Sequence, residues 1–408
     1  MNMAGEIRVG EVRGWFAAAE SVQDRTVALR RAIHAEPELG LQTPKTMAKV
    51  REALADLPLE WKTGRSTTGA IAVLRGAKPG RTVLLRGDMD ALPMPEDTGL
   101  PFKSRIDGAM HACGHDTHTA MLASAARLLA ARRDSLAGTV LFMFQPGEEG
   151  WHGAKFMMDD GLLSDPAPDA AFALHVMPNG PAGVFFAKGG PMMASADTLN
   201  VTVRGKGGHA SMPHDAIDPV PVACEIVTAL QVFVTRRVNI FDPAVLTVAK
   251  IEGGTTNNVI PADATLVGTI RTLSEETREA VRAGVARIAE GIAQAHECEA
   301  EVNIVPGFPV TVCDARAVAF AQSAVTELFG EASWSTMASP IMGAEDFSYV
   351  LQKHPGAMVF LGACPPGQNW KMACPCHSNR MMLDESVLAR GVAAHCAIAE
   401  GFLARGLG

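Results

Sequence analysis

The stretch GTVLFMFQPGEEG, residues 138–150, joins a nearly continuous apolar run to an abrupt end that contains proline and glycine. An apolar run of this length, closed by turn residues, predicts a strand that is buried on both faces of its sheet. Such strands are typical of parallel sheets that have helices packed on both sides. The stretch therefore predicts an α/β fold, and it places Glu148 and Glu149 directly after a buried strand.

The sequence on both sides of this stretch continues to alternate between strand and helix patterns. Long amphipathic helices are predicted at residues 117–134 and 385–404. Further strands rich in branched apolar residues are predicted at residues 69–76, 81–93, 169–178 and 357–366. This alternation predicts an α/β catalytic domain with a central, mostly parallel sheet.

Between residues 190 and 306 the pattern changes to half-exposed strands and two helices. The predicted elements follow the order βαββαβ, which is the ferredoxin-like α+β arrangement. Ser274 is predicted as the N-cap of the second helix, because acidic residues follow it in the first turn. We therefore predict a catalytic domain made of residues 1–190 and 306–408. A ferredoxin-like dimerisation or lid domain, residues 191–305, is inserted into it.

The composition excludes several classes of protein. The 408-residue chain carries a formal net charge of -8 and has a single tyrosine, so neither a basic surface nor stacking platforms for nucleic acid are expected. No apolar run is long enough to predict a membrane span, and the charged N-terminus does not resemble a secretory signal. Eight cysteines scattered over so long a chain favour a reducing, cytoplasmic location.

Polar side chains with metal-binding chemistry follow several of the predicted strands. In open α/β sheets, ligands bind outside the carboxyl ends of the strands, so these side chains are expected to lie close together. Asp88 and Asp90 follow the run TVLLRG (82–87) of the predicted strand, and a second group stands at the start of the helix near residue 115. The candidate metal ligands are Cys113, His115, Glu149, His175 and His377, with Glu148 beside them.

A thiolate, imidazoles and carboxylates together suit zinc and similar divalent ions. A single catalytic zinc takes about three protein ligands, so five candidates favour two ions that share one ligand. Two such ions can hold a hydroxide between them and stabilise a tetrahedral intermediate. Because neighbouring side chains diverge, one of Glu148 and Glu149 is expected to bind metal while the other acts as general base.

Each feature also has a simpler interpretation when it is taken alone. His175 could be a core histidine, GEEG could be an acidic turn, and His118 could face the same pocket without binding metal. Cys113 paired with a histidine could instead be the nucleophile of a cysteine amidase, or the protein could bind a ligand without catalysis. The spacing of Cys374 and Cys376 fits neither a redox motif nor a zinc knuckle, and Cys374 is assigned no role.

Six stretches resemble, in order, the aminoacylase and hippurate hydrolase family of dinuclear metallopeptidases. They are RGDMDALPMPE (86–96), MHACGHDTHTAMLASAA (110–126), FQPGEEGWHGAKFMMDDG (144–161), GGHASMPHDAIDPV (207–220), GGTTNNVIPADATLVGTIRT (253–272) and MGAEDFSYVL (342–351). The branch is that of N-acyl-L-amino-acid amidohydrolases, which includes plant auxin-conjugate hydrolases. The resemblance implies an enzyme that hydrolyses the amide bond of N-acyl-L-amino acids. A dipeptidase or carboxypeptidase on the same fold is the alternative.

The resemblance also implies roles for individual residues. Cys113 would bridge two metal ions whose other ligands are His115, Glu149, His175 and His377, and Glu148 would be the general base. Asp90 is grouped with the catalytic residues. His209 would reach a neighbouring active site and stabilise the oxyanion, Asn258 would contact substrate, and Arg271 would pair with the substrate carboxylate.

The remaining expectations concern the metals, the assembly and the pocket. Zinc or manganese is the expected pair of ions, although cobalt and nickel tolerate the same ligands. The family implies a homodimer or a homotetramer. Thr43 stands where relatives usually carry glutamate, and Met381 and Met382 follow His377 where relatives usually have proline and aromatic residues. We expect these departures to alter substrate choice rather than metal binding.

Overall fold

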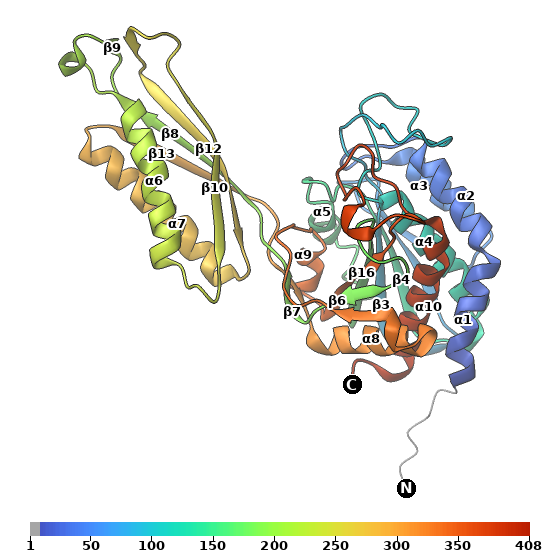
Figure 1. The fold of residues 1–408 in the computed structure, drawn as a ribbon. Helices are drawn as coiled ribbons and strands as arrows, with labels where there is room; N and C mark the ends of the chain where they lie inside the picture. The colour runs from blue at the N-terminus through green and yellow to red at the C-terminus, as the bar shows by residue number, and fades with distance from the viewer. Residues whose placement is uncertain (1–8) are drawn as a thin grey trace. The chain divides into compact units, whose positions relative to one another are not determined.

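The computed structural model describes residues 9–408, which form two compact units. The first unit runs to Gly190 and also contains Val312–Ser339 and Tyr349–Gly408. The second unit consists of Pro191–Thr311 and Pro340–Ser348 (Figure 1). The chain therefore leaves the first unit, builds the second, and returns to complete the first.

The first unit is built around an eight-stranded sheet with the order β1-β2-β4-β3-β5-β16-β6-β15. Its four central strands, β4, β3, β5 and β16, are parallel to one another. The bounds are β1 Glu60–Thr63, β2 Ala70–Arg75, β3 Lys78–Asp88, β4 Ala137–Gln145, β5 Ala170–Met177, β6 Phe185–Ala187, β15 Trp334–Thr336 and β16 Gly356–Gly362. This mixed, largely parallel sheet confirms the predicted α/β fold class.

Strand β4 is the stretch with the nearly continuous apolar run. It pairs with β2 on one side and with β3 on the other, and residues 140–145 are all buried. The strand ends at Gln145, so Pro146 and Gly147 lead directly into the loop that carries Glu148 and Glu149. The prediction of a strand buried on both faces is confirmed.

Some helices of the first unit pack against its sheet, and others pack against those helices. The bounds are α1 Val9–Ser21, α2 Gln23–His34, α3 Pro44–Ala53, α4 His115–Ala131, α5 Gly153–Asp159, α8 Ala315–Phe329, α9 Ser348–Leu351 and α10 Leu388–Arg405. Helix α4 begins at His115, so the residues just before it form a loop beside the end of the sheet. Helices α4 and α10 pack against each other and are buried along most of their length.

The second unit is a four-stranded antiparallel sheet with two helices. The order of its elements is βαββαβ: β8 Asp197–Arg204, α6 Pro219–Arg237, β10 Ala244–Gly253, β12 Asp263–Thr272, α7 Glu275–Ala295 and β13 Glu299–Pro306. The spatial order β10-β12-β8-β13 is the ferredoxin-like order. Both helices lie on one face of the sheet (Figure 1) and share an apolar core with it. The Ser274 hydroxyl accepts the N–H of Thr277, which confirms the predicted N-cap.

Short strands complete the described chain: β7 Gly190–Met193, β9 Gly208–His209, β11 Val259–Ile260 and β14 Thr311–Cys313.

Two helical segments, Pro219–Arg237 and Glu385–Arg405, have the length and composition of membrane-crossing helices. In the second of them 83% of the apolar window is buried inside the protein, and in the first 33%. Core helices of globular proteins meet the same two criteria.

Candidate metal centre

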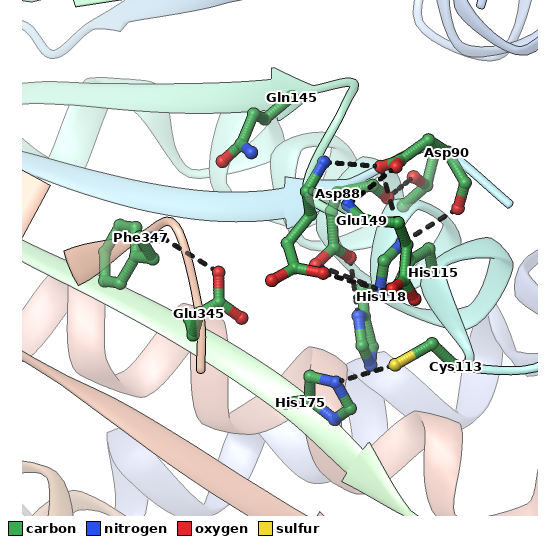
Figure 2. Close-up of polar contacts among 12 residues, drawn as sticks. Asp88, Asp90, Cys113, His115, His118, Gln145, Glu149, His175, Glu345 and Phe347 are labelled. Atoms are coloured by element: carbon green, nitrogen blue, oxygen red, sulfur yellow. Dashed lines mark hydrogen bonds and ion pairs between the residues drawn. The ribbon is translucent and has the colours of Figure 1, made fainter. Parts of the chain in front are cut away.

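Five candidate ligands converge in the first unit from four separate segments. Cys113 lies in the loop before α4, His115 is the first residue of that helix, Glu149 follows β4, and His175 lies near the end of β5. His377 comes from the loop before α10. Figure 2 shows four of these side chains directed toward one another. The ends of parallel strands thus gather the donors, as the sequence predicts.

The donor atoms form two triplets that share one residue. The donors of Cys113, His115 and His175 lie within 4.8 Å of one another, and so do those of Cys113, Glu149 and His377. Within the triplets, Cys113 Sγ is 3.4 Å from His175 Nε2, and His377 Nε2 is 3.2 Å from Glu149 Oε1. A shared thiol between two triplets is an arrangement that suits two adjacent cations.

The two buried histidines of the cluster are held in defined tautomers by the main chain. His115 Nδ1 donates to the Asp90 carbonyl oxygen at 2.8 Å, and His175 Nδ1 donates to the Val176 carbonyl oxygen at 2.7 Å. Each Nε2 is therefore the ring nitrogen that faces the cluster, which is the atom that binds metal once it is deprotonated.

One polar atom at the centre of the cluster is buried and makes no hydrogen bond. It is His115 Nε2, which lies 4.0 Å from Glu149 Oε1. Glu149 Oε1 in turn lies 3.2 Å from His377 Nε2. Burial without a hydrogen bond destabilises a polar atom. A divalent cation would satisfy His115 Nε2, and the residues therefore fit such an ion.

Asp90 positions the loop that carries the two glutamates. Its carboxylate accepts the backbone N–H of Glu148 at 2.9 Å through Oδ1. It accepts that of Glu149 at 3.0 Å through Oδ2 (Figure 2). Asp90 also presents its carbonyl oxygen to His115. One residue thus fixes the general-base candidate, one ligand candidate and the tautomer of a second.

Both ring nitrogens of His118 already have partners in the protein. Its Nδ1 donates to Asp88 Oδ1 at 2.6 Å, and its Nε2 accepts the backbone N–H of Val176 at 2.8 Å. Asp88 also accepts from the Arg86 guanidinium at 2.5 Å. His118 therefore links Asp88 at the end of β3 to Val176 in β5, and neither of its ring nitrogens is available to an ion.

The electrostatic field of the cluster favours cations. Burial lowers the pKa of His115, but the charges of Asp88, Asp90 and Glu149 and the hydrogen bond to Asp90 outweigh it and raise the pKa to about 10. Burial raises the pKa of Glu149, yet the hydrogen bond from His377 and the charges of His115 and His377 hold it below its usual value. The field that stabilises an imidazolium here also attracts a divalent ion.

The thiol of Cys113 does not have the surroundings of an activated nucleophile. A hydrogen bond with the Cys376 thiol and then burial raise its pKa well above the ordinary value. Nucleophilic cysteines show the opposite shift, so the cysteine-amidase interpretation is disfavoured. A bound cation would supply the positive charge that a thiolate at this position needs.

Cys376 is a neighbour of the cluster that sequence reasoning missed. Its Sγ lies 3.9 Å from the carbonyl oxygens of both Cys113 and Val176. The spacing of Cys374 and Cys376 carries no motif, and the only available signal was the position of Cys376 next to the ligand candidate His377.

His377 adopts a left-handed backbone conformation, with a φ of 68°. This region is uncommon for residues other than glycine, and such strain gathers at functional sites. The His377 N–H donates to the Ala112 carbonyl oxygen at 2.7 Å, which holds the segment beside the loop that contains Cys113. The strained backbone and this bond direct the ring toward Glu149.

A buried ion-pair network under the start of α4 was also missed. Asp116 Oδ2 accepts from Arg30 Nε at 2.7 Å and from His34 Nδ1 at 2.8 Å. The three side chains are almost completely buried. Since Asp116 follows His115 directly, the network fixes the first turn of the helix that supplies a ligand candidate.

The second unit holds three further predicted residues. His209 lies on β9 and pairs with Val259 of β11, next to Asn258, whose carbonyl oxygen accepts the Ala210 N–H at 3.1 Å. His209 and Asn258 are thus brought together on an exposed ribbon. Arg271 is at the opposite end of β12 and donates to Thr269 Oγ1 at 2.5 Å. A ten-residue strand, roughly 30 Å long, separates it from the ribbon.

The positions that depart from the family pattern are mainly inside the protein. Thr43 is fully buried, and its N–H donates to Thr68 Oγ1 at 2.7 Å just before α3. Met381 is 2% exposed, whereas Met382 is half-buried. Met381 therefore packs in the core beneath the His377 loop.

A mostly parallel sheet, with thiol, imidazole and carboxylate donors gathered at the ends of its strands, is the arrangement of a metal-dependent hydrolase. The family model described as peptidase family M20/M25/M40 matches residues 84–401. This match covers more than half of the chain, and the protein belongs to that family.

Individual relatives agree over nearly the whole chain. Thermostable carboxypeptidase 1 of Saccharolobus solfataricus is 38% identical over 387 residues, which cover 93% of this chain and 96% of the relative. N-acetylcysteine deacetylase of Bacillus subtilis is 39% identical over 346 residues, covering 85% and 90%. The crystal structure of a dinuclear metal-binding M20 peptidase from Bacillus subtilis superposes with a TM-score of 0.80 at 34% identity, covering 94% and 99%. The predicted family and enzyme class are confirmed.

Proposed function

We propose that this protein hydrolyses the amide bond of N-acyl-L-amino acids with the help of two divalent metal ions. The observation that carries the proposal is the pair of donor triplets that share Cys113, with Glu148 beside them. A relative that is 39% identical is named N-acetylcysteine deacetylase, and its substrate belongs to the proposed class.

The proposed ligands divide between the two triplets. His115 and His175 would hold one ion, Glu149 and His377 would hold the other, and Cys113 would bridge them. Bound ions would lower the pKa of water and polarise the scissile carbonyl group. The tautomers fixed by Asp90 and Val176 leave the Nε2 atoms of His115 and His175 ready to bind without rearrangement.

Glu148 is the proposed general base. Its Oε2 lies 3.9 Å from His115 Nε2, so it borders the ligand cluster, and it is only 6% exposed. Its backbone is held by Asp90, which gives the carboxylate a fixed starting position. From there Glu148 takes a proton from the attacking water and returns it to the leaving amine.

His209 and Asn258 are proposed to act on an active site from their exposed ribbon. His209 would stabilise the oxyanion and Asn258 would contact the substrate, in the active site of a neighbouring subunit of a homodimer or homotetramer. Mixing a His209→Ala variant with a Glu148→Gln variant tests this arrangement. Recovery of activity in mixed oligomers supports the role in trans, and no recovery contradicts it.

Arg271 is proposed to pair with the substrate carboxylate. It is distant from His209 and Asn258 within its own unit, so the three would not contact one substrate from a single subunit. An Arg271→Ala variant that raises KM with an unchanged kcat would support this role. An unchanged KM would remove Arg271 from the site.

The direct test is the release of free amine from a panel of N-acetyl, N-benzoyl and longer N-acyl amino acids. Release that stops with a chelator and returns with zinc or manganese supports the proposal. Cobalt and nickel belong in the same series, because the donor set tolerates both. No release from any substrate under any metal contradicts it.

A metallo-carboxypeptidase or dipeptidase is the second candidate. It is favoured by the 38% identity to a protein named thermostable carboxypeptidase 1, over 93% of this chain. Free dipeptides and N-blocked dipeptides, assayed beside N-acyl amino acids at equal concentration, separate the two functions by the ratio of their kcat/KM values.

A cytoplasmic location is proposed because all eight cysteines are free thiols, as a reducing compartment would keep them.

The proposed assembly is a homodimer or a homotetramer. A sedimentation run at micromolar concentration that shows only monomer would contradict it.

A further inference from the structure

Two free cysteines meet at the ligand cluster from opposite ends of the first unit. Cys113 and Cys376 are 263 residues apart in sequence, yet the Cys376 Sγ lies 3.9 Å from the Cys113 carbonyl oxygen. The two side chains also shift each other's pKa, that of Cys113 upward and that of Cys376 downward. The two cysteines therefore lie at a contact between two loops.

The main chain keeps the two cysteines together. The residue after Cys376, His377, donates its N–H to the residue before Cys113, Ala112, at 2.7 Å. The Cys376 thiol also contacts the Val176 carbonyl oxygen, directly after His175. These contacts hold the two segments that carry the cysteines side by side, and such proximity is the first requirement for a disulfide.

We propose that Cys113 and Cys376 form a reversible disulfide that disables the metal centre when a peroxide is present. The loss of metal binding rests on the proposed function, whereas the formation of the disulfide does not. Both donor triplets contain Cys113, so the loss of this one sulfur removes a donor from each of them. A sulfur that is bonded in a disulfide is no longer a thiolate ligand.

The reaction balances with hydrogen peroxide as the oxidant. One thiol attacks the O–O bond, which forms an S–O bond and releases the first water. The second thiol then attacks that sulfur, forms the S–S bond and releases the second water. The two sulfurs give two electrons to the peroxide, and both thiol protons end in water. A dithiol such as dithiothreitol reverses the bond by exchange and is itself oxidised.

Metal and disulfide compete for the same sulfur. With an ion bound, Cys113 would be a ligand and would be protected from peroxide. In the metal-free protein, both thiols are free to react. Oxidation is therefore expected to be fast in metal-free protein and slow in metal-loaded protein. The disulfide in turn is expected to weaken metal binding by more than about 100-fold, because the loss of even an outer partner of a metal ligand costs about 10–100-fold.

The test begins with reduced, metal-free, full-length protein treated with a small excess of hydrogen peroxide and then alkylated. The expected result is the loss of two of the eight free thiols and a tryptic cross-link between residues 106–127 and 372–380. Since the second peptide holds both Cys374 and Cys376, variants identify the partner. Cys374→Ser keeps the cross-link, and Cys376→Ser abolishes it. A cross-link that survives Cys376→Ser, or no cross-link at all, overturns the proposal.

Metal binding is measured separately, by titration of zinc into the reduced and the cross-linked metal-free protein. Reduced protein that binds two ions and cross-linked protein that binds none support the switch, and dithiothreitol restores binding. Equal binding by the two forms overturns the switch. If neither form binds zinc or manganese, the proposed metal-dependent function fails and the switch fails with it, although the cross-link itself can still be observed by mass.

Discussion

Asp90 Oδ1 accepts the backbone N–H of Glu148 at 2.9 Å, and this bond connects the segment after β3 to the loop after β4. The other carboxylate oxygen of Asp90, Oδ2, accepts the backbone N–H of Glu149. The backbone of two adjacent glutamates is thereby held at the edge of the ligand cluster.

The first prediction concerns the Asp90 anchor. In an Asp90→Ala variant, two buried N–H groups lose their acceptors, which costs about 1–3 kcal/mol each in the free energy of unfolding. Metal affinity should fall by about 10–100-fold, because the ligand loop loses its position. Urea unfolding and metal titration measure the two effects. Asp97→Ala is the control, since its carboxylate is exposed and pairs with Arg380 at the surface. Equal effects of the two variants would contradict the anchoring role.

The second prediction concerns Glu148. A Glu148→Gln variant keeps the shape of the side chain and loses the base, so kcat should fall by about 10²–10⁴-fold. The number of bound metal ions should remain that of the wild type, because the proposed ligand is Glu149. Glu149→Gln is the matched comparison and should lose metal as well as activity. Near-normal turnover in a metal-loaded Glu148→Gln protein would refute the assignment.

Much of the fold was predictable because its determinants are local. Burial of β4 on both faces is recorded in its own apolar residues, and the alternation in β8 and β12 marks half-exposed strands. The ligand candidates were predictable for a related reason. They stand at the ends of such strands, and parallel strands bring those ends to one edge.

The contacts between segments that are distant in sequence were not predictable. Cys376 contacts Cys113 across 263 residues, and Arg30 contacts Asp116 across 86. No spacing or periodicity in either local segment encodes these contacts, because they follow from how the completed fold brings its helices and loops together. The role of Asp90 belongs to the same class, since a carboxylate that binds backbone N–H groups leaves no mark in the sequence.

The third prediction separates His115 from His118. His115→Ala should lower metal stoichiometry, because an Nε2 that faces the cluster is removed. His118→Ala should leave the stoichiometry unchanged and lower the free energy of unfolding by about 1–3 kcal/mol, because Asp88 and the Val176 N–H each lose a buried partner. Metal content per chain and urea unfolding give the two readouts. Loss of an ion in His118→Ala would contradict the structural role.

The last prediction is a pH dependence carried by His34. Burial lowers the pKa of His34, but the charge of Asp116 and the hydrogen bonds to Asp116 and Glu96 outweigh it, against the opposing charge of Arg30, and raise the pKa to about 9. An imidazole whose pKa is higher in the folded protein binds its proton more tightly there. The stabilisation of the folded protein by protonated His34 is therefore complete below about pH 6.5 and is lost as the pH rises through 9. The raised pKa corresponds to about 3 kcal/mol in the free energy of unfolding.

A His34→Gln variant tests this dependence, because glutamine cannot carry the charge. Between pH 6.5 and 9.5, the free energy of unfolding of the wild type, measured with urea in the presence of a chelator, should fall by about 3 kcal/mol more than that of the variant. The carboxylate of Asp116, whose pKa is held far below its usual range despite burial by the charges of Arg30 and His34, works in the opposite direction and only in strong acid. Parallel curves for the two proteins across this alkaline range would show that His34 is neutral in the folded state.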